Sequence, residues 1–402
     1  MEKWECLFCE EPREVNLFWP FCPRCGQPLI VSFPSKKLSF NLSQLSALEK
    51  FQTFLPLPRL EKSLLLGEGN TPLLRLYRLE RKIGLDFPVY GKNEMANPTH
   101  SFKDRGTAVV IQKAVSLRIK KIGTVSTGNM AASTAAYGAK ARLNTFVLLK
   151  EDAALEKTIS TGIYGAHLIQ VKGDYGQLFE ASYRAGKKLG IYFANSCDPY
   201  RLEGYKVVSF ELYFQLKGKI PAYIFVPVSS GGHLLGLILG FLNLRKQNLI
   251  GRLPHFIGVQ AAGCAPLVRA WEKGEEKVLP VKNPHTIAHA ISNPSPPAGQ
   301  LILKLLRKYK GQMLAVSDEE IMRAQAELAS LEGLFCDPAS ATTWAGLKKW
   351  LSFTPARKIA NAVLLLTGSG LKDLTPVKER GKISLIPATL PCLEEVLSSL
   401  AL

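Results

Sequence analysis

The stretch NEMANPTHSFKDRG, residues 93–106, contains one lysine in a distinctive setting. Lys103 follows Phe102 at the point where an Asn-Pro turn gives way to an expected helix, and an Asp-Arg pair comes directly after it. A lysine that served solubility alone would more often lie on an outer helix face. The position of Lys103 therefore indicates a chemical role.

Apolar, strand-like segments alternate with amphipathic, helix-like segments from Gly67 onward. Strand-like runs such as YIFVPVSSGG (223–232) and NAVLLLTGSG (361–370) end in small or polar residues, and helices are expected between the strands, for example over 107–117 and 130–141. This alternation predicts an α/β fold with mainly parallel sheets. In open parallel sheets, ligands bind beyond the carboxyl ends of the strands, so the chemistry is expected there.

The bulk composition is that of a folded globular protein, with 47% hydrophobic and 21% charged residues. A chain of 402 residues predicts two or three domains. No segment resembles a signal peptide or reaches the roughly 20 apolar residues of a membrane span, so we expect a cytoplasmic protein that does not enter membranes.

The net charge of +18 comes from scattered lysines and arginines. Proteins that bind nucleic acid usually gather such charge in one patch or stripe, so nucleic acid is not an expected partner. A basic surface or a field that attracts anionic substrates, such as phosphate esters, agrees better with the pattern.

Four of the eight cysteines form two matched Cys-x-x-Cys pairs near the N-terminus, Cys6 with Cys9 and Cys22 with Cys25. This spacing predicts a structural Zn2+ site with four thiolate ligands in a zinc ribbon over residues 1–35, because four thiolates leave no open position for catalysis. A disulfide pair or a redox dithiol would not explain two matched pairs. The other four cysteines are dispersed, as in a reducing compartment. Residues 36–65 are expected to form a linker with a short helix.

Polar residues follow four of the expected strands and are candidates for ligand binding. Hydroxyls, an amide and backbone N–H groups before a helix can hold an anion, although the same residues can simply cap the helix. A loop of serines and glycines can hold a phosphate, although it matches neither a dinucleotide motif nor a P-loop. An arginine can bind an oxyanion or form a surface ion pair. The candidates are Ser126, Thr127 and Asn129; Asn195 and Arg201; Ser229, Ser230, Gly231, Gly232 and His233; and Thr367.

One chemistry accommodates Lys103 together with these strand ends. A lysine amine can form a Schiff base with the aldehyde of pyridoxal 5′-phosphate. That cofactor also needs an anion cradle, a partner for its ring nitrogen and a nearby site for the amino-acid carboxylate.

The chain resembles the threonine synthases, a family of fold-type II (tryptophan-synthase-β-like) pyridoxal-phosphate enzymes. The resemblance rests on an ordered set of motifs and extends over nearly the whole chain from about Gly67. Some members also carry an N-terminal zinc ribbon. The motifs are GEGNTPL (67–73), NPTHSFKDRG (97–106), STGNMAAS (126–133), NSCDPYRLEG (195–204), GVQAAGCAPLV (258–268), GLFCDPASA (333–341) and TGSGLKD (367–373).

The resemblance implies a role for each candidate. Lys103 would carry the cofactor with Phe102 packed beside it, and Thr367 would face the pyridine nitrogen. Asn129 would bond the ring's 3′-oxygen, and residues 229–233 would hold the cofactor phosphate. The remaining candidates would bind the substrate: Ser126 and Thr127 its carboxylate, Asn195 and Arg201 its phosphate.

The resemblance also implies an activity and an architecture. The expected reaction converts O-phospho-L-homoserine and water to L-threonine and phosphate, by γ-elimination and then β-addition. The expected protein is a homodimer that binds a small amino-acid phosphate. Its large domain would span 66–98 and 190–402, with a small domain, 99–189, inserted.

Several positions near the expected ligands depart from the usual family pattern. His100 replaces a glycine, Met130 a threonine and Ser369 a histidine, and the loop that ends in His233 reads SSGGH where GNGGN is usual. A lost hydrogen bond at a site can change specificity by orders of magnitude. Two alternatives therefore stay open: a related lyase that acts on another amino acid, by replacement on phosphoserine or by dehydration, and a zinc-ribbon binding protein on an inactive scaffold.

Overall fold

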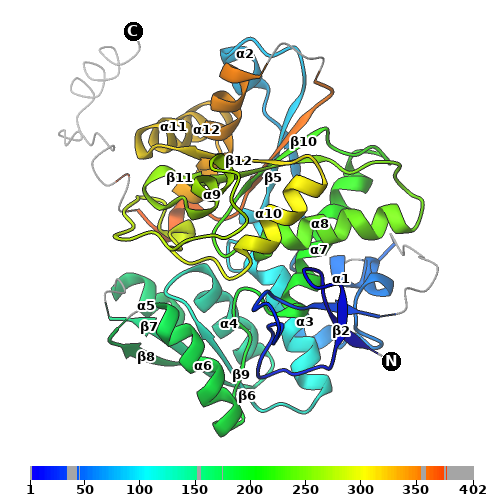
Figure 1. Cartoon of the computed structure of the whole chain (residues 1–402), viewed down its shortest axis with the longest axis vertical. Helices are drawn as coiled ribbons and strands as arrows, with labels where there is room; N and C mark the ends of the chain where they lie inside the picture. Colours follow the sequence, from blue (N-terminus) through cyan, green and yellow to red (C-terminus); the bar gives the residue numbers. More distant parts are fainter. Residues whose placement is uncertain are drawn as a thin grey trace, which may run out of the picture. The chain divides into compact units, whose positions relative to one another are not determined.

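The computed structural model describes residues 2–33, 43–44, 46–151, 155–173, 175–354, 359–374 and 377 (Figure 1). Residues 1–372 form one compact unit and residues 373–402 a second. Parts of the predicted linker and of the predicted large domain, including all of 378–402, lie outside the described residues. Within the described residues, no helix is both long and apolar enough to cross a bilayer.

The N-terminal residues form a small antiparallel sheet in the order β2-β1-β3. Its inner face is covered by the rest of the protein: Trp4 is fully buried and packs edge-on against Tyr200, with ring centroids 6.0 Å apart. A four-residue helix, α1, follows within the predicted linker. These elements are β1 (Lys3–Cys6), β2 (Glu11–Arg13), β3 (Ile30–Ser32) and α1 (Ala47–Lys50).

The larger sheet has six strands in the order β12-β11-β10-β13-β5-β4. All neighbouring strands are parallel except the edge pair β4 and β5. The strands are β4 (Leu73–Arg75), β5 (Val89–Asn93), β10 (Tyr223–Pro227), β11 (His255–Ala261), β12 (Gln312–Val316) and β13 (Ala362–Leu366).

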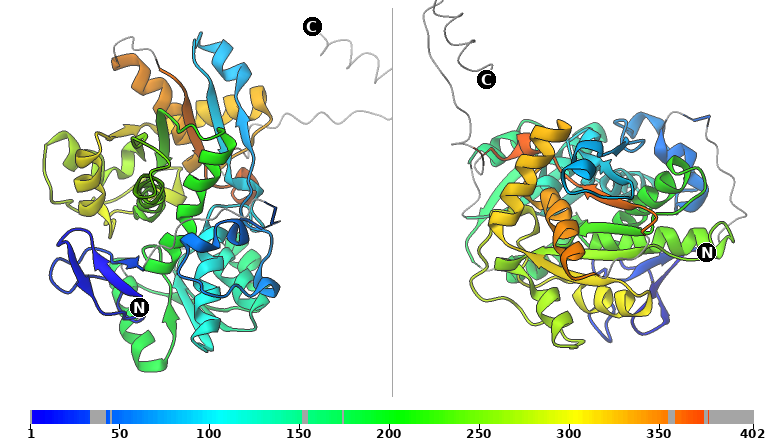
Figure 2. Two further views of the ribbon diagram at one scale, coloured as in Figure 1. Left: turned by 90° about the vertical axis from the view of Figure 1, so that its right-hand side faces the viewer. Right: turned by 90° about the horizontal axis from the view of Figure 1, so that it is seen from above.

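Helices cover both faces of this sheet, as the views in Figure 2 show. Every residue of β13 is buried, because Val363 and Leu365 pack toward α7, α8 and α10 while Leu364 and Leu366 pack toward α11 and α12. This strand is therefore apolar throughout because helices cover both of its faces. The helices are α2 (Tyr77–Lys82), α7 (Pro199–Gln215), α8 (Gly232–Lys246), α9 (Pro266–Glu272), α10 (Gly299–Lys308), α11 (Asp318–Glu332) and α12 (Pro338–Phe353).

The smaller sheet has four parallel strands in the order β8-β7-β6-β9. With the larger sheet, it confirms the predicted α/β class with parallel-rich sheets. Most of its elements come from the stretch between β5 and β10, while the limits of the two domains stay predictions. The elements are α3 (Lys103–Ser116), β6 (Lys121–Val125), α4 (Asn129–Lys140), β7 (Asn144–Lys150), α5 (Leu155–Gly162), β8 (His167–Val171), α6 (Tyr175–Leu189) and β9 (Tyr192–Phe193).

Candidate active site and cysteine cluster

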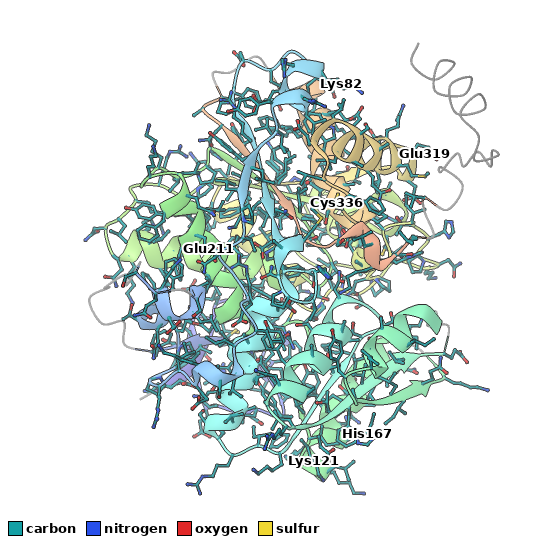
Figure 3. The ribbon with its side chains drawn as sticks, turned by 180° about the vertical axis from the view of Figure 1, so that it is seen from behind. Lys82, Lys121, His167, Glu211, Glu319 and Cys336 are labelled. Atoms are coloured by element: carbon teal, nitrogen blue, oxygen red, sulfur yellow. The ribbon has the colours of Figure 1, made fainter. Side chains whose placement is uncertain are left out.

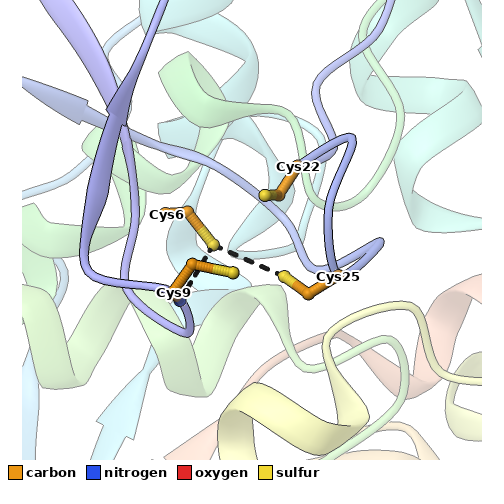
Figure 4. Close-up of side chains that lie close together, drawn as sticks. All are labelled: Cys6, Cys9, Cys22 and Cys25. Atoms are coloured by element: carbon orange, nitrogen blue, oxygen red, sulfur yellow. Dashed lines mark hydrogen bonds between the residues drawn. The ribbon is translucent and has the colours of Figure 1, made fainter.

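The four N-terminal cysteines converge (Figure 4): their sulfur atoms all lie within 4.8 Å of one another. The Sγ atoms of Cys6 and Cys25 are 3.5 Å apart, and the backbone N–H of Cys9 donates to Cys6 Sγ at 3.3 Å. Four sulfurs bound to one zinc at about 2.3 Å lie roughly 3.8 Å apart in a tetrahedron, so the donor set fits this ion.

The surroundings of the cluster favour a thiolate at Cys22, whereas burial raises the pKa of Cys6 and that of Cys25. Burial raises the pKa of Cys22, but backbone N–H groups of Cys25 and Arg24 and the Arg13 guanidinium act the other way and bring that pKa to about 6. Metal ligation needs this deprotonated form.

The cysteine-bearing segment packs on two different parts of the rest of the protein. The rings of Trp19 and Phe21 each lie 5.8 Å from Tyr183 on α6. On the other side, Gln27 Oε1 accepts a hydrogen bond from the backbone N–H of Leu301, in the first turn of α10, at 3.0 Å. The segment is thus anchored by its aromatic face and by a helix cap.

The segment that precedes α3 is held against the end of β13. Phe102 N–H donates to the carbonyl of Thr367 at 3.0 Å, and Ser369 N–H donates to the carbonyl of His100 at 3.1 Å. His100 has φ 60°, in the left-handed region that glycine adopts easily. These contacts bring Lys103 and the loop 367–369 to the same place, although they are far apart in the sequence.

Lys103 is the first residue of α3 and has an apolar setting. Its Nζ lies 4.4 Å from the ring centroid of Phe102 and 5.9 Å from that of Tyr205. Burial, with a smaller contribution from the Arg201 guanidinium, lowers the pKa of Lys103 to about 7. No carboxylate among the described residues forms an ion pair with it. An amine of this kind is partly neutral near pH 7 and can act as a nucleophile or a base.

A buried ionic network fixes the first turn of α3 immediately after Lys103. Arg105 donates to Glu94 in the segment after β5 and to Glu211 on α7, with distances of 2.5 to 2.8 Å. Lys92 Nζ donates to Glu211 Oε2 at 2.6 Å, and Glu211 is labelled in Figure 3. Although burial opposes it, Arg105 and Lys92 hold the pKa of Glu211 far below its usual range. The network ties α3, α7 and β5 together.

The loop between β10 and α8 packs closely against its neighbours and leaves the N-terminus of α8 without a side-chain cap. Gly231 has φ 90° and precedes α8 without a side-chain cap. A Cβ at Gly232 would lie 2.5 Å from the carbonyl oxygen of Ser196, so only glycine fits this approach. Ser230 Oγ accepts a hydrogen bond from Asn293 at 2.9 Å. Ser229, the residue before Ser230, is partly buried.

His233 lies in the first turn of α8 beside Lys103. Its ring stacks on Phe102 with centroids 4.0 Å apart, and only 6% of its surface is exposed. Neither ring nitrogen has a hydrogen-bond partner among the described residues. Burial lowers the pKa of His233 to about 3, so the imidazole is neutral at physiological pH.

Thr367 and Asn129 are linked by a chain of hydrogen bonds that passes through Ser340 and Asp337. Thr367 Oγ1 lies 3.0 Å from Ser340 Oγ, and Ser340 donates to Asp337 Oδ1 at 2.6 Å. Burial raises the pKa of Asp337 to about 6, while hydrogen bonds from Ser340 and Asn129 act in the opposite direction. A Cβ at Gly368 would lie 2.9 Å from Asn129 Nδ2, so this glycine lets α4 approach the end of β13.

The residues expected to bind substrate differ in how far hydrogen bonds within the protein already occupy them. Asn195 is fully buried and committed to the protein: its Oδ1 accepts from Val125 N–H at 2.8 Å, and its Nδ2 donates to Ser182 at 3.2 Å. Ser126 Oγ accepts from Gly128 N–H at 3.2 Å in a turn before α4, and the N-terminus of α4 has no side-chain cap. Thr127 is partly buried beside it.

Arg201 is fully buried on α7, so its interpretation as a surface ion pair with Glu203 is wrong. Glu203 pairs with Lys206 at 2.6 Å instead. The Arg201 guanidinium donates to Thr107 Oγ1 at 2.7 Å and to the carbonyl of Ala194 at 2.8 Å, and among the described residues no carboxylate pairs with it. A buried guanidinium without a counter-ion favours an anionic ligand.

A family model described as "Pyridoxal-phosphate dependent enzyme" matches residues 64–368. This chain belongs to the pyridoxal-phosphate dependent enzyme family. The fold of the family is confirmed by solved structures, among them a fungal L-serine ammonia-lyase from Rhizomucor miehei, with a TM-score of 0.64 and 22% identity over 75% of this chain and 94% of that one. The processed form of threonine deaminase isoform 2 from Solanum lycopersicum gives a TM-score of 0.63 and 19% identity over 74% and 79%.

The sequence relatives are more similar to the chain than the solved structures are, with identities above 30%. A threonine synthase from Methanocaldococcus jannaschii is 37% identical over 375 residues, 92% of each chain. One from Methanosarcina acetivorans is 35% identical, again over 92% of each chain, and one from Synechocystis is 36% identical over 81% of this chain and 83% of its own.

The residues around Lys103 fit pyridoxal phosphate, the cofactor of this family. A desolvated amine is present at Lys103, and the N-terminus of α8, a helix of 15 residues, carries no side-chain cap and can face a phosphate. The two ring nitrogens of His233 have no partner among the described residues. They also indicate a bound ligand, because buried polar atoms are nearly always hydrogen-bonded.

Two residues of the pocket were not found from the sequence. Tyr205 lies one helical turn after Arg201, and Ser196 lies beside Asn195, and their hydroxyls are buried without a partner among the described residues. The i, i+4 spacing from Arg201 was the available signal for Tyr205. Only the packing of α7 against α3 shows that this face of the helix points toward Lys103.

Proposed function

We propose that this chain is a threonine synthase, which converts O-phospho-L-homoserine and water to L-threonine and phosphate. The observation that carries the proposal is the identity of 35–37% over 92% of the chain to two threonine synthases. The buried, unpaired guanidinium of Arg201 near Lys103 supports a phosphorylated substrate. A dehydratase would have no need of such a group.

The chain's own residues supply the binding site of the cofactor. When bound, pyridoxal phosphate withdraws electrons from the substrate and so makes protons on its carbon atoms removable. Lys103 would attach the cofactor with Phe102 beside it, Asn129 would bond the ring oxygen, and Thr367 would face the ring nitrogen. A neutral hydroxyl there would not enforce protonation of that nitrogen. Ser229, Ser230, Gly231, Gly232 and His233 would hold the phosphate.

Lys103 also moves protons. Burial lowers the pKa of its amine to about 7, so the amine could remove the proton from the α carbon of the substrate. The same amine can then move a proton between the β and γ carbons. The apolar rings of Phe102 and Tyr205 limit hydration of the amine and keep it neutral.

The remaining residues bind and orient the substrate. Ser126 and Thr127, with the N-terminus of α4, bind the carboxylate. Arg201 binds the phosphate group, and Asn195 supports the site by fixing the end of β6. Together they hold the γ carbon and its leaving group beside Lys103.

The cysteine cluster is proposed as a structural zinc site. Cys6, Cys9, Cys22 and Cys25 supply four ligands, and their convergence within 4.8 Å supports a single ion. Four protein ligands complete its coordination, so the metal contributes stability and not chemistry.

The assembly and location of the protein are also proposed. The family resemblance supports a homodimer, and the dispersed free cysteines support the reducing environment of the cytoplasm. The scattered basic charge supports a small amino-acid phosphate as the ligand and no nucleic acid.

A second candidate activity is replacement at the β carbon of O-phosphoserine. The buried Met130, in the first turn of α4, favours it because a thioether there cannot bond a substrate oxygen as threonine would. A phosphate grip would serve both substrates.

The test is an assay of the cofactor-loaded protein with each phosphorylated amino acid. We expect phosphate release from O-phospho-L-homoserine with threonine formed in equal amount, and no turnover by Lys103→Ala. Release from phosphoserine alone, in the presence of sulfite or a thiol, would select the second candidate. A loaded protein that releases phosphate from neither substrate would refute the proposal.

A further inference from the structure

Tyr205 occupies a slot between three helices. It lies on α7 and is fully buried. A Cβ at Gly106 on α3 would lie 2.7 Å from Tyr205 Cε1, and a Cβ at Gly236 on α8 would lie 2.5 Å from Tyr205 Cβ. Two glycines on two helices therefore make the space that the tyrosine needs.

The ring of Tyr205 lies beside the catalytic lysine. Its centroid is 5.0 Å from that of Phe102 and 5.7 Å from that of His233, and 5.9 Å from Lys103 Nζ. The hydroxyl is therefore carried into the pocket by a ring that is fixed on several sides.

Two donors on this face of α7 have no partner among the described residues: Tyr205 Oη and Arg201 Nε. They are one helical turn apart, and both the charge of the Arg201 guanidinium and its close contact with the hydroxyl lower the pKa of Tyr205. Burial outweighs that effect and raises the pKa of Tyr205 to about 12, so the hydroxyl remains protonated and can donate.

The neighbouring carboxylates do not supply the missing acceptor. Asp104 accepts from the hydroxyl and the backbone N–H of Thr99, both at 2.6 Å, and Asp198 accepts from Tyr192 at 2.6 Å while it caps α7. Two buried donors without an acceptor, one of them charged, indicate an anionic oxygen from a ligand.

We propose that Tyr205 Oη and Arg201 Nε together bind a phosphate oxygen of the substrate, which makes Tyr205 a specificity-determining residue. The inference rests on the proposed function for the identity of the substrate. The ring of Tyr205 also lies 5.7 Å from that of His233 in the cradle of the cofactor phosphate, so the test has to separate the two positions. Arg201 also contacts Thr107 on α3 and Ala194 after β9, which belong with the smaller sheet, whereas the cradle follows β10 of the larger sheet.

The test measures binding of inorganic phosphate to the cofactor-loaded protein by calorimetry. Because the cofactor occupies its own phosphate cradle, added phosphate reports on the second position. Tyr205→Phe keeps the ring and removes the hydroxyl. We expect phosphate binding to weaken about tenfold to a hundredfold, as for loss of a hydrogen bond to a charged group. KM for the phosphorylated substrate should rise, with the affinity for pyridoxal phosphate unchanged.

Two further variants complete the test. Tyr183→Phe alters another buried tyrosine, on α6, and should bind phosphate like the wild type. Tyr205→Gln places an amide donor at the site and should recover part of the lost affinity.

Two results would overturn the inference. One is wild-type phosphate binding by Tyr205→Phe, and the other is weaker pyridoxal-phosphate binding with phosphate binding intact. If the hydroxyl controls phosphate binding but the protein does not act on O-phospho-L-homoserine, the proposed function fails and the anion site stands.

Discussion

The cysteine cluster and the Lys103 pocket are assembled in opposite ways. The cluster takes its four sulfurs from a segment of about twenty residues, where two turns of fixed spacing bring them together. The pocket takes its side chains from α3, α7, α8 and the end of β13, which meet only when the larger sheet has formed. Local spacing can therefore encode a metal site, whereas the pocket depends on long-range packing.

The two regions also differ in what stabilises them. The N-terminal sheet has strands of three or four residues, too little to form a core of its own, so we expect it to depend on the proposed metal. The pocket is held by buried ion pairs and by glycine contacts between helices. Each region can be disturbed by its own substitutions, and four experiments compare the two.

Loss of a thiolate should give the largest effect. In Cys22→Ser we expect bound zinc to fall from about one ion per chain to none, and the ribbon to lose stabilisation on the order of 10 kcal/mol. Metal analysis measures the first change, and limited proteolysis of residues 2–33 the second. Cys264→Ser removes a buried thiol outside the cluster and should retain the metal. A full complement of zinc in Cys22→Ser would contradict the four-thiolate site.

Disruption of the ionic network should have the next largest effect. Glu211→Gln leaves Lys92 and Arg105 buried with less negative charge, and breaking a buried ion pair costs about 3–5 kcal/mol. Denaturant unfolding measures this change. Glu180→Gln breaks an exposed pair with Arg184 and should unfold like the wild type. Equal stability of the two variants would show that the network does not support the pocket.

The pH dependence of the rate at which Lys103 binds the cofactor tests the Lys103 pocket independently of the cysteine cluster. Because burial lowers the pKa of Lys103 to about 7, the lysine loses its proton as the pH rises through that value, and the reactive neutral amine predominates above it. We expect the capture rate of the cofactor-free protein, followed by absorbance, to rise about tenfold per pH unit below pH 7 and then level off. A rate that still climbs toward pH 10 would indicate an ordinary lysine.

The smallest effect concerns the contact between the two regions. Gln27→Ala removes the acceptor at the N-terminus of α10 and should reduce the free energy of unfolding by about 1 kcal/mol. Metal content should not change, since Gln27 is not a ligand. Gln170→Ala, on an exposed position of β8, serves as the control in the same denaturant titration. An identical loss in both variants would mean that the cap contributes nothing.

The sequence predicted most of what depends on pattern. Strand–helix alternation gave the fold class, cysteine spacing gave the cluster, and the setting of Lys103 identified the lysine that the structure finds desolvated beside Phe102. The family usually has glycine where this chain has His100. The backbone at His100 is left-handed, which explains that preference because glycine adopts this conformation easily.

What the sequence could not predict depends on side-chain partners from distant elements. Arg201 was compatible with the surface until the packing of α3, α4 and α7 buried it. Asn195 seemed free to bind a ligand, yet its amide joins the end of β6 to α6. Tyr205 gave no signal beyond its helical spacing, since the slot that receives it is made by glycines on two other helices.

The most direct test of the account is the location of the covalent bond between the protein and its cofactor. Protein saturated with pyridoxal phosphate is reduced with borohydride and digested, and the modified peptide is identified by mass spectrometry. We predict a single adduct, on Lys103. An adduct on another lysine, or none at all in saturated protein, would contradict the central claim.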